Sequence, residues 1–268
     1  MADYRSQFGL RHKIVAFAST KLFSNFVYRV RSGPARGLLR KGGLGFLPVN
    51  FRPTAEIQFL DDLNLAGKTV YDIGGFEGIL TMFFARKAAA VFTYEPNPRN
   101  YARCIENVKL NQLANVRVFN RGVSSKPGEL QMAYDPLMPG GASANTEFVR
   151  QIREMPNRTQ TTSIPVVALD SDIERHGLPA PDFLKIDIEG MELQALQGMR
   201  RTLEQRGPDL FIELHGAELT DKVRIASGVV DLLREIGYRM RDVENACDVV
   251  SITAGVLPPS HLFCTKTA

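Results

Sequence analysis

The stretch from Thr69 to Gly78 constrains the fold of this chain more than any other part of the sequence. It reads TVYDIGGFEG, so a β-type run ends at an acid and a glycine-rich turn follows. Residues 79–88 then continue with the pattern of a helix. Nucleotide-binding sheets place such a turn at the carboxyl end of their first strand. The stretch therefore predicts an α/β domain with a ligand site at this turn.

The order of residues in the motif narrows the choice of ligand. Dinucleotide-binding turns read G-x-G-x-x-G, which lets the backbone approach an anionic pyrophosphate. Here Asp72 precedes Gly74, Gly75 and Gly78, in the order D-x-G-x-x-x-G. A carboxylate suits a ligand that has an ammonium group and no phosphates, and S-adenosylmethionine fits that description. Another nucleotide and an ordinary strand–turn–helix are the alternatives.

From about residue 54 onward, short β-branched runs alternate with helical patterns. This alternation predicts an α/β fold, with a mostly parallel seven-stranded sheet and helices on both faces. We expect strands near 69–73, 91–95, 116–119, 182–187, 209–214, 238–242 and 261–265. We expect helices near 54–63, 79–88, 98–111, 191–205 and 221–236. Residues 128–134 and 161–167 have β character and flank a long loop, which we interpret as a candidate substrate lid.

The N-terminal part differs from the rest in charge and pattern. Residues 1–52 carry ten Lys or Arg against one acid, while the whole chain has a net charge of +4. The apolar residues that recur at helical spacing over 11–30 are Val15, Leu22, Phe23, Phe26, Val27 and Val30. The face they form packs on the core or, alternatively, contacts a membrane surface. We expect a basic helical extension with a Gly/Pro-rich linker over residues 1–53, and the main domain over residues 54–268.

Cysteine usage and hydropathy exclude several classes of protein. Cys104, Cys247 and Cys264 form no C-x-x-C pair, so neither a zinc knuckle nor a disulfide framework is indicated. Charged and polar residues interrupt the apolar positions of 14–30, which is unlike a secretory signal. No apolar run is long enough to span a bilayer. These features predict a cytoplasmic protein.

Two further strand ends carry residues that suit a nucleoside. Glu95 closes the second strand, 23 residues after the acid of the first motif, and can accept hydrogen bonds from both ribose hydroxyls. Pro96 and Asn97 follow it, and Asn97 suits the cap of the next helix. After the third strand, Gly122 and Val123 could flank an adenine, although a plain loop is an equal alternative.

Ionisable residues gather at the ends of the fourth and fifth strands. Lys185, Asp187 and Glu189 alternate through an apolar strand end, which places them on one face. Burying such charges is costly unless they are paired or functional. Glu213 and His215 share a face of the fifth strand, and a histidine can exchange a proton near neutral pH. A structural ion-pair cluster and an oxygen/nitrogen metal site are the alternatives; we predict no metal ion.

With these residues in place, the sequence resembles FkbM-type methyltransferases over about residues 54–240. The matching stretches are DFLKIDIEGME at 182–192 with Leu196 and Gly198, YDIGG at 71–75, YEPNP at 94–98 and IELH at 212–215. The resemblance implies a class I methyltransferase fold (Rossmann-like), with S-adenosylmethionine as donor. It also implies a hydroxyl acceptor on a sugar, polyketide, lipid or other small metabolite, and makes residues 54–268 the catalytic domain.

The resemblance also implies roles for particular residues. Asp72, Gly74 and Gly78 would hold the methionine end of the donor, Glu95 its ribose, and Asp187 would lie near the sulfonium. The family's first motif usually reads D-x-G-A-N-x-G. Here Gly75 and Phe76 replace the alanine and the asparagine, so the polar side chain expected at position 76 is missing.

The predicted reaction is a direct displacement, in which the acceptor hydroxyl attacks the sulfonium methyl group in line and the thioether leaves. A hydroxyl is a poor nucleophile until a base or a metal ion takes its proton. We expect His215 to be that base, with Asp187 as second choice and Lys185 in the same catalytic cluster.

Three rival functions remain. The basic N-terminus would suit a nucleic-acid methyltransferase, but the fourth strand lacks the N/D-P-P-Y/F motif of amino-directed enzymes, so a nucleic-acid partner is not expected. A non-catalytic S-adenosylmethionine-binding module is the second alternative. A dehydrogenase is disfavoured because Asp72 occupies the place of the first motif glycine. No oligomeric state is predicted.

Overall fold

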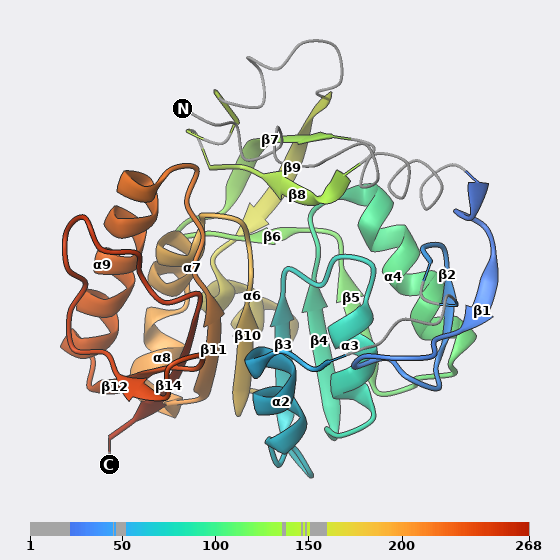
Figure 1. The fold of residues 1–268 in the computed structure, drawn as a ribbon, viewed down its shortest axis with the longest axis horizontal. Helices are drawn as coiled ribbons and strands as arrows, with labels where there is room; N and C mark the ends of the chain where they lie inside the picture. Colours follow the sequence, from blue (N-terminus) through green and yellow to red (C-terminus); the bar gives the residue numbers. More distant parts are fainter. Residues whose placement is uncertain are drawn as a thin grey trace.

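The structure is a computed structural model that describes residues 22–44, 46, 52–135, 138–145, 147, 149–150 and 160–267. Its centre is an eight-stranded sheet with the strand order β13-β12-β14-β11-β10-β3-β4-β5 (Figure 1). The strands are β3 (Thr69–Ile73), β4 (Ala90–Tyr94), β5 (Val116–Phe119), β10 (Phe183–Ile186), β11 (Asp209–Glu213), β12 (Tyr238–Asp242), β13 (Cys247–Asp248) and β14 (His261–Lys266). The seven predicted strands are confirmed to within two residues, and β13 is an additional strand at the edge.

The sheet is parallel across β5, β4, β3, β10 and β11. β14 runs antiparallel to both of its neighbours, β11 and β12. The carboxyl ends of the five parallel strands therefore meet at one edge of the sheet. Ligands of open α/β sheets bind outside these strand ends.

Helices cover both faces of this sheet, as predicted. They are α2 (Ala55–Asp62), α3 (Ile79–Ala85), α4 (Pro98–Leu110), α6 (Leu169–His176), α7 (Glu192–Gly198), α8 (Arg200–Arg206) and α9 (Leu219–Glu235). The single helix expected over 191–205 is wrong: two helices form there, separated at Met199 (φ −122°, ψ 16°). A Cβ on Gly198 would lie 1.9 Å from the Ser124 carbonyl oxygen, so the helix ends against a neighbouring strand segment.

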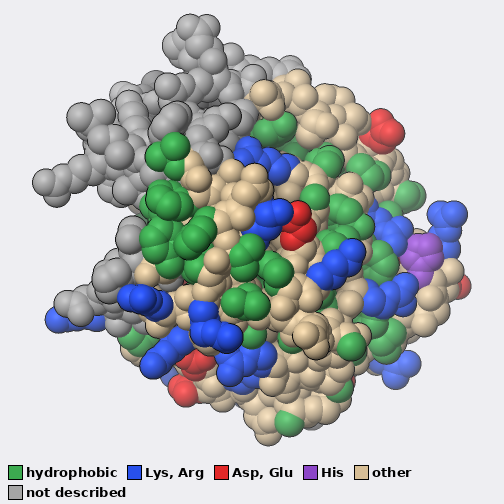
Figure 2. All heavy atoms as spheres, turned by 90° about the vertical axis from the view of Figure 1, so that its right-hand side faces the viewer, with side chains coloured by type: hydrophobic (Ala, Val, Ile, Leu, Met, Phe, Trp, Pro, Cys, Tyr) green, Lys and Arg blue, Asp and Glu red, His purple; other side chains and the backbone are tan. Residues whose placement is uncertain are grey.

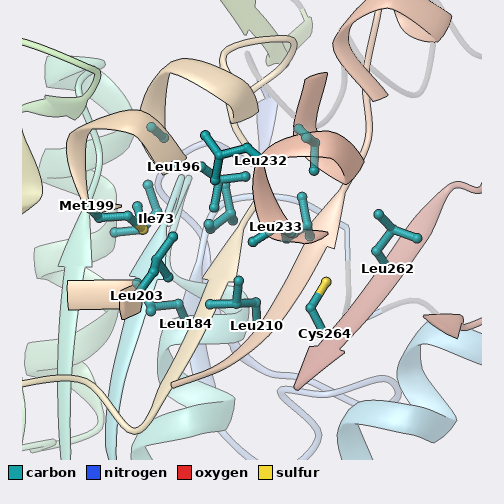
Figure 3. Packing of buried hydrophobic residues seen from close by; sticks show 14 of the residues in the cluster. Ile73, Leu184, Leu196, Met199, Leu203, Leu210, Leu232, Leu233, Leu262 and Cys264 are labelled. Atoms are coloured by element: carbon teal, nitrogen blue, oxygen red, sulfur yellow. The ribbon is translucent and has the colours of Figure 1, made fainter. Parts of the chain in front are cut away.

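Successive residues of the central strands face two different hydrophobic cores in alternation. Tyr71 and Ile73 of β3 face the larger core, which packs against α6, α7, α8 and α9, whereas Val70 faces a smaller core under α2 and α3. This is the period-two alternation of a strand buried on both faces. Figure 3 shows part of the larger core, where residues of α7, α8 and α9 meet those of β3, β10, β11 and β14.

A second, four-stranded sheet lies at the end of the molecule where the parallel strands terminate (Figure 1). It consists of β6 (Gly122–Val123), β7 (Gly128–Asp135), β8 (Met138–Ser143) and β9 (Gln160–Val167), in the order β6-β9-β7-β8. Met132, Ile164 and Val166 form its own small core. The two runs of β character at 128–134 and 161–167 are confirmed as strands. The long loop expected between them contains a further strand, β8.

The described N-terminal residues pack on α4. β1 (Val27–Arg29) and β2 (Leu39–Lys41) pair antiparallel. The side chains of Asn107 in α4 and of Asn111, its C-cap residue, accept hydrogen bonds from the backbone N–H groups of Lys41 and Leu39, each at 2.8 Å. The helix predicted over 11–30 is therefore wrong at its end, where β1 forms; residues 11–21 lie outside the described part. The Gly/Pro-rich linker expected within residues 1–53 contains β2.

Exposed apolar side chains lie beside basic ones on this face of the molecule. Leu22, Phe26 and Val27 are exposed by 68%, 48% and 42%. Figure 2 shows Lys and Arg side chains distributed among hydrophobic ones on the side that carries β1, β2 and α4 in Figure 1. Membrane contact through residues 11–30 stays a prediction. Among the described helices, none is long and apolar enough to cross a bilayer.

Candidate active site

The glycine-rich turn after β3 is held tightly against β4 and β10. The backbone N–H groups of Gly74 and Gly75 both donate to the Tyr94 carbonyl, at 2.9 and 3.2 Å. A Cβ on Gly74 would lie 1.8 Å from the Asp187 carbonyl oxygen, and one on Gly75 would lie 2.1 Å from Thr93 Cγ2. Only glycine fits these two positions, so the turn brings the ends of three strands into contact.

Asp72 lies beneath this turn and is completely buried. Its Oδ2 accepts a hydrogen bond from Thr81 Oγ1 at 2.6 Å, and its Oδ1 lies 3.5 Å from Lys185 Nζ. Lys185 also donates to the Gly74 carbonyl at 2.9 Å and pairs with Asp187 Oδ2 at 3.0 Å. Burial alone would lower the pKa of Lys185, but Asp187 and Asp72 raise it above its ordinary value. The ammonium therefore joins the ends of β3 and β10.

A cavity of about 300 Å³ opens above the turn, and we call it the Glu95 cavity. Half of the predicted site residues line it: Gly74, Glu95, Pro96, Gly122, Val123 and Asp187. The other half are not part of its described wall: Asp72, Gly75, Gly78, Asn97, Lys185 and His215. Further lining residues that the sequence analysis did not assign to the site are Ile73, Phe76, Tyr94, Asn100, Ile188, Glu189 and Met191. Residues of β7, β8 and β9 line another side of the cavity.

Glu95 is oriented by the backbone around it. Its Oε2 accepts from the Phe76 N–H and its Oε1 from the Asn97 N–H, both at 2.8 Å. Burial raises the pKa of Glu95 to about 7, although these hydrogen bonds oppose the rise. The Asn97 side chain caps α4 by accepting from the Arg99 and Asn100 N–H groups, as predicted. The carboxylate is thus fixed in the cavity wall.

His215 lies beside the cavity in a cluster of carboxylates. Its Nδ1 is 3.2 Å from Oε1 of the buried Glu192, and its Nε2 is 3.2 Å from Glu213 Oε1. Nε2 also lies 3.9 Å from Asp187 Oδ1 and 4.0 Å from Glu189 Oε2. Burial would lower the pKa of His215, but these carboxylates raise it to about 11. The imidazole therefore keeps its proton near neutral pH.

Glu189 stands between this cluster and the cavity. Its backbone has φ +53°, in the left-handed region that a non-glycine residue rarely adopts. Ser143 Oγ donates to the Glu189 carbonyl at 2.6 Å, and Asn145 Nδ2 donates to the Gly190 carbonyl at 2.9 Å. Burial raises the pKa of Glu189 to about 7, and His215 opposes that rise. The sequence did contain a signal for Glu189: charged residues alternate at this strand end, and that alternation could have placed Glu189 in the site.

Three residues of this cluster have the geometry to share a cation. Asp187, Glu213 and His215 each offer one ligand atom, and these atoms lie within 4.8 Å of one another. Oxygen and nitrogen donors of this kind suit several divalent ions. In the present arrangement, His215 and Lys185 provide positive charge beside the carboxylates. The expectation that the protein uses no metal ion stays a prediction.

The comparisons with known proteins agree on one family. Residues 72–240 match the family described as the methyltransferase FkbM domain. The chain is 25% identical to the hexuronic acid methyltransferase AglP of Haloferax volcanii, over 65% of this chain and 71% of AglP. It is 25% identical to the 2-O-methyltransferase NoeI of Sinorhizobium fredii, over 68% of this chain and 79% of NoeI. It is 26% identical to the 31-O-demethyl-FK506 methyltransferase FkbM of Streptomyces tacrolimicus, over 64% and 73% of the two chains.

Two other curated relatives are covered less completely. Across these five relatives, the match spans between 57% and 79% of the relative's own length. The family match covers the turn after β3, Glu95 and the whole carboxylate cluster. It extends over more than half of the chain and includes each strand end that lines the Glu95 cavity. The chain therefore belongs to the FkbM methyltransferase family and is an S-adenosylmethionine-dependent methyltransferase.

Proposed function

We propose that the protein transfers a methyl group from S-adenosylmethionine to a hydroxyl oxygen of a small acceptor such as a sugar, polyketide or lipid. The observation that carries the proposal is the Glu95 cavity, which joins a fixed carboxylate to the carboxylate cluster at the ends of β10 and β11. The names of AglP, NoeI and FkbM support an acceptor of this kind, since two of them specify methylation at oxygen.

The cavity fits the chemistry of the donor. Glu95 would accept hydrogen bonds from the ribose hydroxyls, while Val123 and Pro96 would pack on the purine. Asp187 and Glu189 add negative charge to the wall, and this suits a ligand that carries a sulfonium and an ammonium group. When bound, S-adenosylmethionine supplies an electrophilic methyl group.

The other residues predicted to bind S-adenosylmethionine would contribute by shaping the backbone of the site. No side chain fits at Gly74, so this position offers only its backbone to the ligand. Gly75 and Gly78 belong to the same turn. Asp72 supports the turn from below through Lys185. Asn97 follows Pro96 and caps α4, and Gly122 begins β6 close to the Pro96 ring. We assign these residues to donor binding through the backbone that they hold.

The structure leads us to assign the base that accepts the acceptor's proton to a different residue from the one that the sequence predicts. A base must take the proton of the acceptor hydroxyl before or while the oxygen attacks. His215, the expected base, already holds a proton and does not line the described cavity wall. Glu189 does line it and has a pKa near neutrality. We therefore assign proton acceptance to Glu189, with His215 and Asp187 positioning the cluster.

Calorimetric titration with S-adenosylmethionine and with NAD, each with and without a chelator, tests the donor. We expect S-adenosylmethionine to bind, NAD not to bind, and the chelator to change neither result. A panel of sugars, lipids and peptides with labelled donor then tests the transfer. Donor binding without transfer to any acceptor would favour the non-catalytic binding module, and tight NAD binding would contradict the proposal.

A further inference from the structure

The hairpin of β1 and β2 packs one face on the main domain and presents the other to solvent. Tyr28 and Val30 are buried, and they form a small core with Ala35 and with Met82 of α3. The Tyr28 hydroxyl donates to the Gly42 carbonyl at 2.9 Å, which joins β1 to the residue that follows β2. The hairpin is therefore fixed on the domain, and this fixes the position of its outer face as well.

The outer face begins with three residues that alternate with the buried ones. Val27, Arg29 and Arg31 are all exposed. The pairing with the second strand continues past β1, because the Val30 N–H donates to the Leu38 carbonyl at 2.8 Å. Alternation along such an extended segment places the three exposed side chains on one side. One apolar side chain and two guanidinium groups therefore follow one another on the same face.

Further apolar side chains are exposed beside this segment. The described part of the chain has seven large apolar side chains that are exposed, and three of them lie within residues 22–27. These three are Leu22, Phe26 and Val27. The Phe26 ring contacts the rings of Phe23 and Phe46, at centroid distances of 6.1 and 5.3 Å. These contacts hold the Phe26 ring in place while about half of the residue faces solvent. Exposed apolar side chains that gather in this way mark an interaction surface.

The charge of the outer face is positive and is not offset by acids. Residues 22–44 contain five Lys or Arg and no Asp or Glu, and two of the five pair with acids of the main domain. The other three, Arg29, Arg31 and Arg36, are exposed and form no ion pair in the described part of the chain. Arg29 NH1 donates only to a backbone carbonyl, which leaves its charge uncompensated. Arg86 is likewise exposed without an ion pair, and its NH1 donates to the Arg36 carbonyl at 3.0 Å. Four guanidinium groups are thus available to a polyanion.

The combination of charge and apolar side chains distinguishes between possible partners. A second copy of the chain would bring like charges together in a symmetric contact, which disfavours self-association. A nucleic acid would pair with the arginines, but it would leave the apolar side chains against phosphates and water, whereas such interfaces are polar. An anionic bilayer suits both, because headgroup phosphates attract guanidinium groups and apolar side chains enter the boundary between headgroups and acyl chains.

We propose that the outer face of the hairpin binds the surface of an anionic lipid bilayer. We call this surface the hairpin face, and its residues are Leu22, Phe26, Val27, Arg29, Arg31 and Arg36. An arginine close to an anionic surface strengthens binding about fivefold, and apolar side chains that leave water add to this. The inference does not depend on the methyl acceptor, so its failure would leave the proposed function intact.

Co-sedimentation of the protein with lipid vesicles measures the binding. The vesicles consist of phosphatidylcholine alone or of phosphatidylcholine mixed with phosphatidylglycerol, at low and at high salt. We expect binding to the mixed vesicles only, and weaker binding at high salt, because salt screens exposed charges. Equal binding to both kinds of vesicle, or binding to neither, would overturn the proposal. A short RNA bound more tightly than the mixed vesicles would assign the face to nucleic acid and would overturn it too.

Two matched pairs of substitutions test whether the hairpin face is the surface that binds. Arg29→Gln together with Arg31→Gln should weaken binding to the mixed vesicles about 25-fold. The control is Arg239→Gln together with Arg241→Gln, which also removes two alternate, exposed arginines. These lie on β12, at the opposite side of the molecule from β1 (Figure 1), so the control should bind as the wild type does. Equal binding by the two variants would overturn the assignment of this face.

A third variant tests the apolar part of the surface. Leu22→Ser together with Val27→Ser leaves the charge and the contacts of the Phe26 ring unchanged, and it should weaken binding to the mixed vesicles roughly tenfold. The affinity for S-adenosylmethionine, measured by calorimetry, should equal that of the wild type in all three variants, which also shows that each of them folds. Wild-type binding of Leu22→Ser/Val27→Ser to the vesicles would overturn insertion into a bilayer and leave only attraction between charges.

Discussion

Glu189 combines backbone strain with a partly buried carboxyl group at one residue. Its left-handed backbone costs on the order of 1–3 kcal/mol, and such residues persist when their surroundings hold them in place. The hydrogen bonds from Ser143 and Asn145 do so, and both come from the end of the small sheet and the residues after it. Phe76, in the turn after the neighbouring strand β3, also has a positive φ of 50° and lines the same cavity. Strain at two sides of one cavity is consistent with a site built for a ligand.

Replacing Glu189 by Gln should lower single-turnover methyl transfer about 100-fold or more, because the acceptor hydroxyl loses its base. The pKa of Glu189 is raised to about 7, so the proton-accepting carboxylate dominates above that pH. The wild-type rate at saturating donor should therefore rise between about pH 6 and 8. The variant should lose this rise, whereas Glu174→Gln, on the exposed face of α6, should keep it. If Glu189→Gln kept the wild-type pH profile, another group would be the base that accepts the hydroxyl proton.

Glu95 allows a separate test of donor binding. Glu95→Gln should weaken the affinity for S-adenosylmethionine by roughly 10- to 100-fold, because hydrogen bonds to a charged group are stronger than neutral ones. An amide also cannot accept from both the Phe76 and the Asn97 N–H groups. Calorimetry of the two proteins measures the difference. Equal affinities would show that the ribose is held elsewhere.

At the scale of elements, the sequence predicted what local pattern determines and missed what distant contacts determine. Strands β3, β5 and β12 begin and end where their β-type runs do. The break between α7 and α8 was not predictable, because it follows from the approach of Gly198 to Ser124, which lie far apart in the sequence. β2 was missed for a similar reason, since asparagines of α4 complete its backbone hydrogen bonds.

The contact between the ends of β3 and β10 can be measured with two glycine variants. Gly74→Ala should lower the free energy of unfolding by at least about 3 kcal/mol, because its Cβ would overlap the Asp187 carbonyl. Gly67→Ala is the matched control: its φ of +74° is also positive, but nothing lies within 4 Å of the added Cβ. It should cost only about 1–2 kcal/mol. Chemical denaturation of both variants gives the comparison, and equal losses would argue against the close approach.

The attachment of β2 to α4 gives a further prediction. The Asn111 side chain accepts from the Leu39 N–H at 2.8 Å and donates to the Leu39 carbonyl at 2.7 Å. Asn111→Ala should lower the free energy of unfolding by about 1–3 kcal/mol, because both backbone groups lose their partner. Denaturation together with limited proteolysis of the N-terminal segment measures the effect. Wild-type stability and protection would show that β2 does not depend on this pairing.

For the molecule as a whole, the sequence predicted which strand ends carry the candidate site but not the contacts within it. The motifs identified the strand ends, and the structure brings Asp187, Glu213 and His215 together there. Motifs could not reveal that His215 is surrounded by carboxylates, since Glu192 reaches it from the next helix. Nor could they reveal the Glu95 cavity, because part of its wall comes from the strands of the second sheet. Side-chain chemistry can be read from a motif, whereas pKa values and cavities depend on packing.

The most direct test of the account is the atom that receives the methyl group. The protein is incubated with S-adenosylmethionine carrying a ¹³C-labelled methyl group and with an acceptor identified in the panel of sugars, lipids and peptides, and the product is examined by NMR. The account predicts a labelled methyl ether, formed by the wild type and strongly reduced in Glu189→Gln. A label on nitrogen or carbon, or no transfer from a donor that binds, would contradict it.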